Sequence, residues 1–325
     1  MLQHVLLAEP PAPPKPRPLD PLNPTVFHEA WWLEAMAGDR LQEVTVTSGG
    51  RTIGRLPFVM RRRPGGRTLC EMPTLTHFLG PAIDAGSGSL ANRALKQAQI
   101  TRELLQQLPR SDAFQQRLHR GIEEVMAFQE NGFTASVDFT FELHPTEEEL
   151  IWKGMRDKTR NMIRRARTLY TVEQIDDPER FAALYAGNLR ARGTDSYYPP
   201  GEIIRLVSAA QARDQGRVLA ARAEDGSLVA AIFYVWDHRS AYYLLSTRLP
   251  DSDNSAVSLL LWEAVCHGNA EGRIFDFDGV SSQGNRVFFT GFGGVIRPRY
   301  VVTRQTALYR LAEMATRGCK ALLRR

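Results

Sequence analysis

Two aspartates stand at the end of Ile274–Gly279, a short apolar segment with the sequence of a buried strand that ends in a glycine turn. Neighbouring residues of a strand face opposite ways, so one of the two, Asp276 or Asp278, is expected to point inward. A carboxylate at a strand end in a cleft could deprotonate or orient an amine, which must lose a proton before it attacks an acyl carbonyl. Both aspartates are therefore candidate catalytic residues, and the alternative is hydrogen bonding to loop backbone.

The most basic stretch of the chain runs from Lys153 to Arg167, where seven basic residues accompany one acidic residue, Asp157. At about 100° per residue, residues 150–170 form one amphipathic helix with an apolar arc and a cationic arc. Cations at this spacing repel one another unless an anion lies nearby, and the planar arginine fork suits phosphate oxygens. Lys158, Arg160 and Arg164 are therefore candidate ligands of a phosphate-bearing substrate; the alternative is a solvated helix face.

A second anion site is suggested by a predicted strand, 240–247, that leads through a loop into a helix starting near Asn254. Backbone N–H groups at a helix start bind anions such as pyrophosphate, and Ser246 on the strand is a candidate substrate contact. The loop, however, contains no glycine and carries two aspartates. Asp253 or Asn254 is more simply expected to serve as the helix N-cap.

Three further segments have the composition of ligand-contacting loops. Segment 192–200 contains Tyr197 and Tyr198, segment 73–81 contains His77, and segment 286–294 alternates aromatic residues, including Phe289, with glycines. All four are candidate substrate contacts. A lone histidine more often has a structural role, and the last segment could equally be a bulge in the core.

The elements that must position these residues are similar in the two halves of the chain. A hairpin is predicted around Gly49–Gly50 and another around Asp225–Gly226, each followed by an apolar strand. Helical segments 90–108 and 255–269 also correspond. We therefore expect a duplicated α/β unit, with a proline-rich flexible tail over 1–24, a first domain over 25–149, and a second over 150–325 that begins with the basic helix.

Composition limits the class of protein. The chain has 325 residues, 43% hydrophobic and 24% charged, as in ordinary soluble globular proteins. The net charge is +5, and residues 153–167 alone contribute 7 − 1 = +6, which favours a local anion site over a surface that coats nucleic acid. The three cysteines form no C-x-x-C pair, which argues against a zinc site and against disulfides. No signal peptide or membrane span is recognisable, so a cytoplasmic location is expected.

Taken together, these segments resemble the Fem-like branch of the GNAT superfamily over roughly residues 25–310. The resemblance is carried, in order, by 158–166, 258–264, 275–279 and 292–294. It implies an α/β (α+β) architecture, namely a tandem duplicated GNAT-like acetyltransferase fold with mixed, mostly antiparallel sheets flanked by helices. The family's late motif typically reads F-K-x-x-F-G, and here Phe289 occupies the lysine position.

The resemblance implies an N-acyltransferase without a covalent enzyme intermediate and without a metal. The expected reaction moves an acyl or aminoacyl group from acyl-CoA or aminoacyl-tRNA onto an amine of a cell-envelope or polysaccharide precursor, and tRNA is a possible partner. Two alternatives stay open: an ordinary acyl-CoA-dependent acetyltransferase that acts on a small amine, and a non-catalytic nucleic-acid-binding protein.

Overall fold

The computed structural model describes residues 20–63, 65–279 and 282–322. The first part of the chain forms η1 (Val26–His28), α1 (Ala30–Ala37), η2 (Gly38–Arg40), β1 (Leu41–Ser48), β2 (Arg51–Arg62), β3 (Thr68–Glu71), β4 (Ala82–Ile83), α2 (Leu90–Gln106), β5 (Ala113–Arg117), α3 (Met126–Glu130) and β6 (Thr134–Leu143). The rest forms α4 (Glu148–Gly154), α5 (Asp157–Leu169), β7 (Tyr170–Gln174), α6 (Pro178–Ala191), α7 (Pro200–Gln211), β8 (Gly216–Ala223), β9 (Leu228–Trp236), β10 (Ser240–Arg248), α8 (Ser255–Ala270), β11 (Ile274–Asp276), α9 (Gln283–Thr290), β12 (Val295–Gln305) and α10 (Ala307–Leu322).

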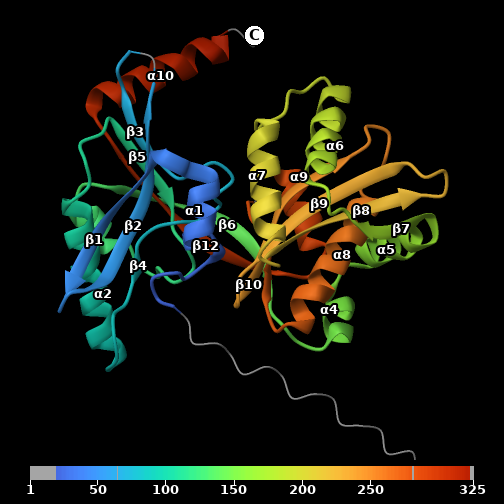
Figure 1. Ribbon diagram of the computed structural model, residues 1–325, viewed down its shortest axis with the longest axis horizontal. Coiled ribbons are helices and arrows are strands. Elements are labelled where there is room, and N and C mark those ends of the chain that lie inside the picture. Colours follow the sequence, from blue (N-terminus) through green and yellow to red (C-terminus); the bar gives the residue numbers. More distant parts are fainter. Residues whose placement is uncertain (1–19, 64, 280–281, 323–325) are drawn as a thin grey trace, which may run out of the picture.

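Two lobes lie side by side and share one mixed sheet (Figure 1). Within the described residues its strand order is β1-β2-β3-β5-β12-β6-β11-β10-β9-β8-β7, with β4 paired to β2. Most neighbours are antiparallel, and the parallel pairs of strands are β3 with β5 and β10 with β11. The predicted mixed α/β architecture is confirmed.

The two lobes repeat one arrangement and exchange their last strands. In the first lobe β1, β2, β3 and α2 lead to β5, which is parallel to β3; in the second, β8, β9, β10 and α8 lead to β11, which is parallel to β10. The next strand of each lobe then pairs with the other lobe: β6 pairs with β11, and β12 pairs with β5. Because β12 also pairs with β6 over nine positions, residues assigned from the sequence to the second domain are built into the first lobe.

Both predicted hairpins form where their turn residues stand. Gly49 and Gly50 adopt φ of 57° and 75° between β1 and β2, a region that side chains with a Cβ rarely enter. Gly226, with φ of 84°, turns the chain between β8 and β9. The turn chemistry therefore sets the register of both hairpins.

The helix predicted over 150–170 is wrong as a single helix, because the chain breaks into α4 and α5 at Met155 and Arg156, which are extended. The guanidinium of Arg160 donates to the carbonyl oxygens of Trp152, Lys153 and Met155 at 3.3, 2.8 and 2.9 Å, and so satisfies the end of α4. At the same place Gly293 packs so closely that a Cβ on it would lie 2.5 Å from the Gly154 carbonyl oxygen.

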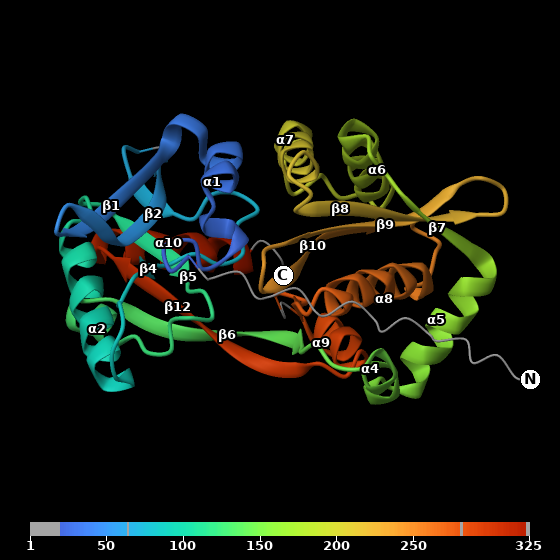
Figure 2. The same cartoon turned by 60° about the horizontal axis from the view of Figure 1, so that its bottom comes forward.

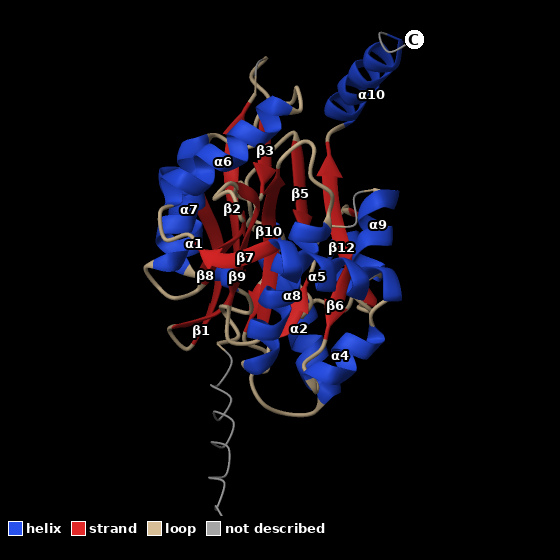
Figure 3. Cartoon of the chain, turned by 90° about the vertical axis from the view of Figure 1, so that its right-hand side faces the viewer, coloured by secondary structure: helices blue, strands red, loops and turns tan. Residues whose placement is uncertain are grey.

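Helices cover both faces of the sheet in the second lobe, with α6 and α7 on one face and α8 on the other (Figures 2 and 3). The segment of η1 and α1 belongs to the core of this lobe, although it precedes the first lobe in the chain: Phe27 and Trp32 lie in one cluster with Phe181, Ile203 and Tyr242. The predicted helix around Phe27–Met36 is thus found as η1 and α1.

Most of the proline-rich tail predicted over 1–24 lies outside the described residues. Its last residues are described, and Arg55 on β2 donates to the Leu22 carbonyl oxygen at 2.8 Å and to the Asn23 side chain at 2.7 Å. These contacts fix the entry of the chain against the first lobe.

Candidate active site

The sheet divides at the junction of the lobes. The parallel strands β10 and β11 pair over three positions, from Ser240 with Ile274 to Tyr242 with Asp276. β11 then ends, whereas β10 continues to Arg248 with a partner strand, β9, on its other edge only among the described strands. The residues that follow β11 therefore leave the sheet at a point where β10 has an unpaired edge.

Asp276 lies at this division and is completely buried. Its carboxylate accepts a hydrogen bond from Thr140 and lies 3.3 Å from an Arg120 nitrogen and 3.2 Å from an Arg299 nitrogen. Burial raises the pKa of Asp276 and outweighs the opposing effect of the two arginines. Asp276 therefore holds Arg120 and Arg299 in place. Its carboxylate has no exposed surface that could contact a substrate.

Glu142 on β6 completes this buried ion cluster. It pairs with Arg299 and lies 3.4 Å from Arg120. Although burial opposes ionisation, the two arginines hold the pKa of Glu142 below its usual value. Two carboxylates and two guanidinium groups, from β6, β11, β12 and the loop after β5, thus neutralise one another between the lobes.

Asp278 has different neighbours, although it is only two residues away. Its Oδ2 lies 2.6 Å from Nδ1 of His77, which comes from the first lobe, and its Oδ1 lies 3.8 Å from Arg117. Burial would raise the pKa of Asp278, but His77 and Arg117 bring it below its usual value. The backbone at Asp278 has φ of 52°, a conformation that non-glycine residues rarely adopt outside functional or strongly constrained positions.

The aromatic loop 192–200 contributes Tyr198 to the same place. Burial, followed by the negative charge of Asp278, raises the pKa of the Tyr198 phenol, which keeps it protonated. Tyr243 on β10 is half-buried, and its partial burial raises its pKa to about 12 against a hydrogen bond with Ser246. The structure thus pairs His77 with Asp278 and places Tyr198 within electrostatic range of the Asp278 charge, whereas Tyr197 is 71% exposed.

The basic residues of α5 lie on another surface of the second lobe. Arg160 is engaged by the end of α4 and by Asp157. Arg164 stacks over the Trp152 ring at 5.5 Å and contacts Asn161, while Lys158 is exposed. Of the three predicted phosphate ligands, Arg160 has a clear structural role, and Lys158 and Arg164 keep charge available to solvent.

Phe289, in the position of the family lysine, lies in the core. It is 5% exposed, and its ring lies 5.3 Å from that of Phe277 and 6.2 Å from that of Tyr243. Segment 286–294 was predicted to be a ligand-contacting loop or a bulge in the core, but its first five residues belong to α9 instead. Phe289 therefore supports the segment that leads from β11.

The start of α8 is occupied by the protein's own carboxylate. Of the two predicted N-cap residues, Asn254 holds the N-cap position but makes no side-chain capping bond, and Asp253, one position earlier, accepts from the Ser255 N–H at 2.8 Å. The hydrogen bonds from Ser255 lower the pKa of Asp253, so the carboxylate stays ionised. A pyrophosphate at this helix start would meet that negative charge.

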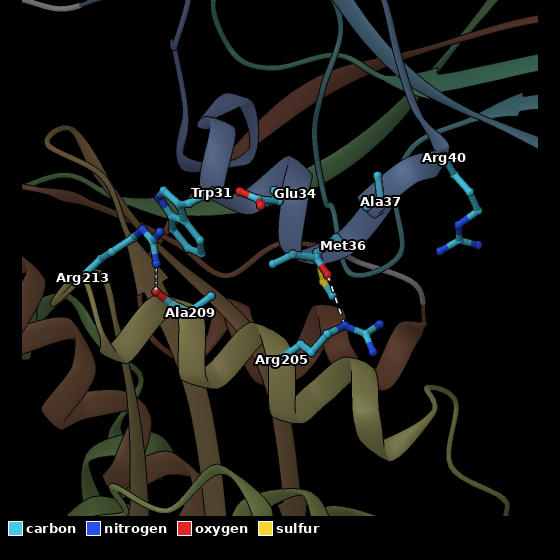
Figure 4. A pocket seen from close by; sticks show the side chains of 10 residues that line it. Trp31, Glu34, Met36, Ala37, Arg40, Arg205, Ala209 and Arg213 are labelled. Carbon is cyan, nitrogen blue, oxygen red and sulfur yellow. Dashed lines mark hydrogen bonds between the residues drawn. The ribbon is translucent and has the colours of Figure 1, made fainter.

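Two open cavities lie away from these residues. One, of about 620 Å³, is bordered by α1 and α7, where Arg205 donates to the Ala35 carbonyl oxygen at 3.4 Å and Arg213 lies over Trp31 (Figure 4). The other, of about 910 Å³, is lined by 167–171 and 222–225. Neither cavity is lined by a predicted catalytic residue. Arg205 has a structural role, since it donates to a carbonyl oxygen near the end of α1.

The described part of the chain also bears on metal binding, cysteine chemistry and membrane insertion. No group of three or more His, Cys, Asp or Glu side chains there is arranged to hold a metal ion. Burial raises the pKa of both Cys70 and Cys266, which makes poor nucleophiles of their thiols. No helix of the described residues is long and apolar enough to span a membrane.

Comparison with known proteins agrees with this geometry. Residues 153–285, which contain the divided strands, match the family model of the acetyltransferase (GNAT) domain. These residues have a GNAT-like fold. No curated protein matches the chain.

Solved structures extend the likeness to the whole fold. FemX has a TM-score of 0.63 and 13% identity, with 87% of this chain and 93% of FemX covered. The C-terminal domain of a putative lysylphosphatidylglycerol synthetase from Agrobacterium fabrum has a TM-score of 0.55 at 15% identity, covering 85% of this chain and 87% of that one. A tandem GNAT protein from the clavulanic acid biosynthesis pathway has a TM-score of 0.52 at 13% identity, with coverages of 81% and 82%. The predicted tandem GNAT-like fold and its resemblance to the Fem-like branch are confirmed.

Sequence reasoning missed the arginines and the glutamate that surround the aspartates. Arg120 and Asp276 are 156 positions apart, and Arg299 and Glu142 are 157 apart. No local pattern joins residues at such separations, because the exchange of β6 and β12 brings them together. Only the strand pairing of the folded sheet could have identified them.

Proposed function

We propose that this protein is an N-acyltransferase whose reaction takes place where β10 and β11 separate. The observation that carries the proposal is the pair of His77 and Asp278, 2.6 Å apart, contributed by different lobes at the division of a GNAT domain. A site assembled from two lobes can hold a donor and an acceptor against each other, which converts a bimolecular reaction into one within a complex.

The residues of the site suit deprotonation of an amine. In the proposed reaction His77 carries its proton on Nδ1, 2.6 Å from the Asp278 carboxylate, which leaves a lone pair on Nε2 for the proton of the acceptor ammonium. Asp278, whose pKa is lowered, remains ionised and stabilises the imidazolium that forms. The free amine then attacks the acyl carbon, a C–N bond forms, and the bond to the donor sulfur or oxygen breaks.

Tyr198 suits the other half of the reaction. Its phenol stays protonated because burial and the charge of Asp278 raise its pKa. A protonated phenol can donate a hydrogen bond to the oxyanion or to the departing donor atom, where charge develops in the transition state. This role does not require the lysine that Phe289 replaces.

Two donors are compatible with this chemistry, and different observations favour them. The GNAT domain match favours acyl-CoA. The ionised Asp253 at the start of α8 and the glycine-free loop oppose a pyrophosphate there, which favours an aminoacyl-tRNA ester. For the acceptor, we propose an amine on a phosphate-bearing cell-envelope or polysaccharide precursor that is long enough to extend from His77 to the other surface of the lobe, where Lys158 and Arg164 would contact its phosphates.

Transfer assays with both donors test the proposal. Labelled acetyl-CoA and aminoacyl-tRNA are each offered with amino sugars, nucleotide-linked amino sugars and nucleotide-linked peptides, and labelled amide is measured. We expect amide from one donor, with a fall of about a hundredfold or more in His77→Gln and Asp278→Asn, since general bases contribute about that much. Amide formation that is unchanged in both variants would exclude the assigned base, and no transfer from either donor would exclude the reaction.

A further inference from the structure

The last described helix, α10, is amphipathic, and three of its large apolar side chains are exposed. Leu308, Leu311 and Met314 are 80%, 64% and 64% exposed. At about 100° per residue, this spacing places the three side chains within one third of the helix circumference. α10 makes no extensive contact with another described element and projects beyond the first lobe (Figures 1 and 3). Three large apolar side chains gathered in this way mark a docking surface.

Exposed arginines surround the base of the same helix. The Thr306 N–H, just before α10, donates to the Asp112 carbonyl oxygen, and Asp112 in turn accepts from the Thr68 N–H at the start of β3. The turn between β2 and β3 and the loop before β5 therefore meet α10 at one end of the sheet. They carry Arg62, Arg67 and Arg110, all exposed, beside the exposed Arg310 of α10 itself.

These four arginines have no acidic partner among the described residues, since every ion pair of the β2–β3 turn uses Arg61 or Arg63 with Glu71. The one acidic residue of α10, Glu313, accepts from the Gln305 side chain at 3.2 Å. The sequence that follows, 316–325, adds four basic residues and no acidic one. An apolar stripe bordered by arginines without acidic partners is complementary to a partner that has an apolar interior for the stripe and negative charges at its surface for the arginines.

We propose that α10 and the adjoining arginines dock this protein on the surface of an anionic phospholipid bilayer. Leu308, Leu311 and Met314 enter the boundary between head groups and acyl chains, as in helices that lie in the membrane plane. Arg62, Arg67, Arg110 and Arg310 contact the lipid phosphates, each worth about 1 kcal/mol near an anionic surface. This surface is separate from the catalytic residues, so docking does not depend on the proposed reaction.

Vesicle flotation of the full chain tests the proposal. We expect binding to phosphatidylglycerol–phosphatidylcholine vesicles, weaker binding at high salt because the charges are screened, and little binding to pure phosphatidylcholine. Leu308→Glu/Leu311→Glu should weaken binding roughly tenfold or more, since two apolar side chains leave the bilayer. Arg62→Ser/Arg67→Ser should weaken it about fivefold per arginine.

Matched variants on α2, in another part of the first lobe, serve as controls. Leu90 and Leu95 are 78% and 72% exposed, and Arg93 is exposed between them. Leu90→Glu/Leu95→Glu and Arg93→Ser should leave vesicle binding unchanged. The proposal is overturned if wild-type protein does not float with anionic vesicles or if the α10 and α2 variants lose binding equally. It is also overturned if sedimentation shows a dimer that the α10 variants dissociate while no vesicle is bound, which would assign the surface to a second copy.

Discussion

Asp276 and Asp278 share a strand end but differ in what surrounds them. Asp276 is enclosed by Arg120, Arg299 and Thr140, while Asp278 meets His77 beside Tyr198. A buried guanidinium that loses its carboxylate becomes an uncompensated charge. The first aspartate therefore supports the fold, and the second is available for chemistry.

We expect Asp276→Asn to lower the free energy of unfolding by about 3 kcal/mol, as when one partner of a buried ion pair is removed. Asp278→Asn, at the edge of the cluster, should change the free energy of unfolding by much less and should instead lower acyl transfer about a hundredfold or more. Urea unfolding and the transfer assay, applied to both variants, separate the two effects. Equal losses of stability in the two variants would contradict this division of roles.

Two buried histidines make the stability of the chain depend on pH. His119 accepts from the Gly121 N–H through Nδ1, so its Nε2–H donates to the Pro81 carbonyl oxygen at 3.0 Å. His28 has the same arrangement, with Nδ1 at Thr25 and Nε2 at Gly80. Burial lowers the pKa of His119 from 6.5 to about 4 and lowers that of His28 well below its usual value. Both rings are therefore neutral in the folded protein.

The pKa of His119 is 6.5 in the unfolded chain and about 4 in the folded protein, so between these pH values the unfolded chain binds a proton that the folded chain does not. The free energy of unfolding therefore rises with pH across this window and is lost as the pH falls from 6.5 towards about 4. We expect His119→Gln to reduce this slope by up to about 1.4 kcal/mol per pH unit, the value for one proton. Urea unfolding at several pH values measures it. His238→Gln, at an exposed position, should leave the slope unchanged. An identical slope in the His119 variant would refute the assignment.

Among the elements, the break between α4 and α5 shows how one side chain ends a helix. Arg160 satisfies three carbonyl oxygens at the break, whereas Arg164, one turn further, faces the Trp152 ring and solvent. Arg160→Ala should therefore lower the free energy of unfolding by about 1–3 kcal/mol, since three carbonyl oxygens lose a charged donor. Arg164→Ala should cost less than about 1 kcal/mol.

Binding of a nucleotide-linked amine shows which of these two arginines contacts phosphate. Because Arg164 keeps its charge available, Arg164→Ala should weaken binding of the phosphate-bearing ligand while the melting temperature is nearly unchanged. If instead Arg164→Ala leaves affinity unaltered and Arg160→Ala lowers it without a loss of stability, Arg160 is the phosphate ligand and its capping role is secondary.

The elements also show which parts of the fold could be predicted from the sequence. Both hairpins were predictable because Gly49–Gly50 and Asp225–Gly226 decide the turn by local backbone chemistry. The break between α4 and α5, at Met155 and Arg156, could not be predicted, since it depends on Arg160 and on the close approach of Gly293 from another segment. In the candidate site, Asp278, His77 and Tyr198 could be named from residue type and loop composition. Their contacts, and the arginines around Asp276, arise from strand pairing between distant segments.

For the whole molecule, the exchange of β6 and β12 joins two similar lobes into one sheet. β12 pairs with β5 in the first lobe and with β6, which itself pairs with β11 in the second. The buried ion cluster spans the same strands. Neither lobe can therefore lose its structure without leaving the other with unpaired strands and unpaired buried charges, and we expect a single cooperative unfolding transition.

The distribution of tryptophan makes this expectation measurable. Trp32, Trp152 and Trp262 pack in or against the two cores of the second lobe, whereas the first-lobe core around Phe58, Leu104 and Phe114 contains none. Tryptophan fluorescence therefore follows the second lobe, and far-ultraviolet circular dichroism follows both. The two urea curves should coincide with one midpoint and one slope. A dichroism transition that precedes or follows the fluorescence change would mean that the lobes unfold independently, and that β6 and β12 couple them less strongly than their pairing requires.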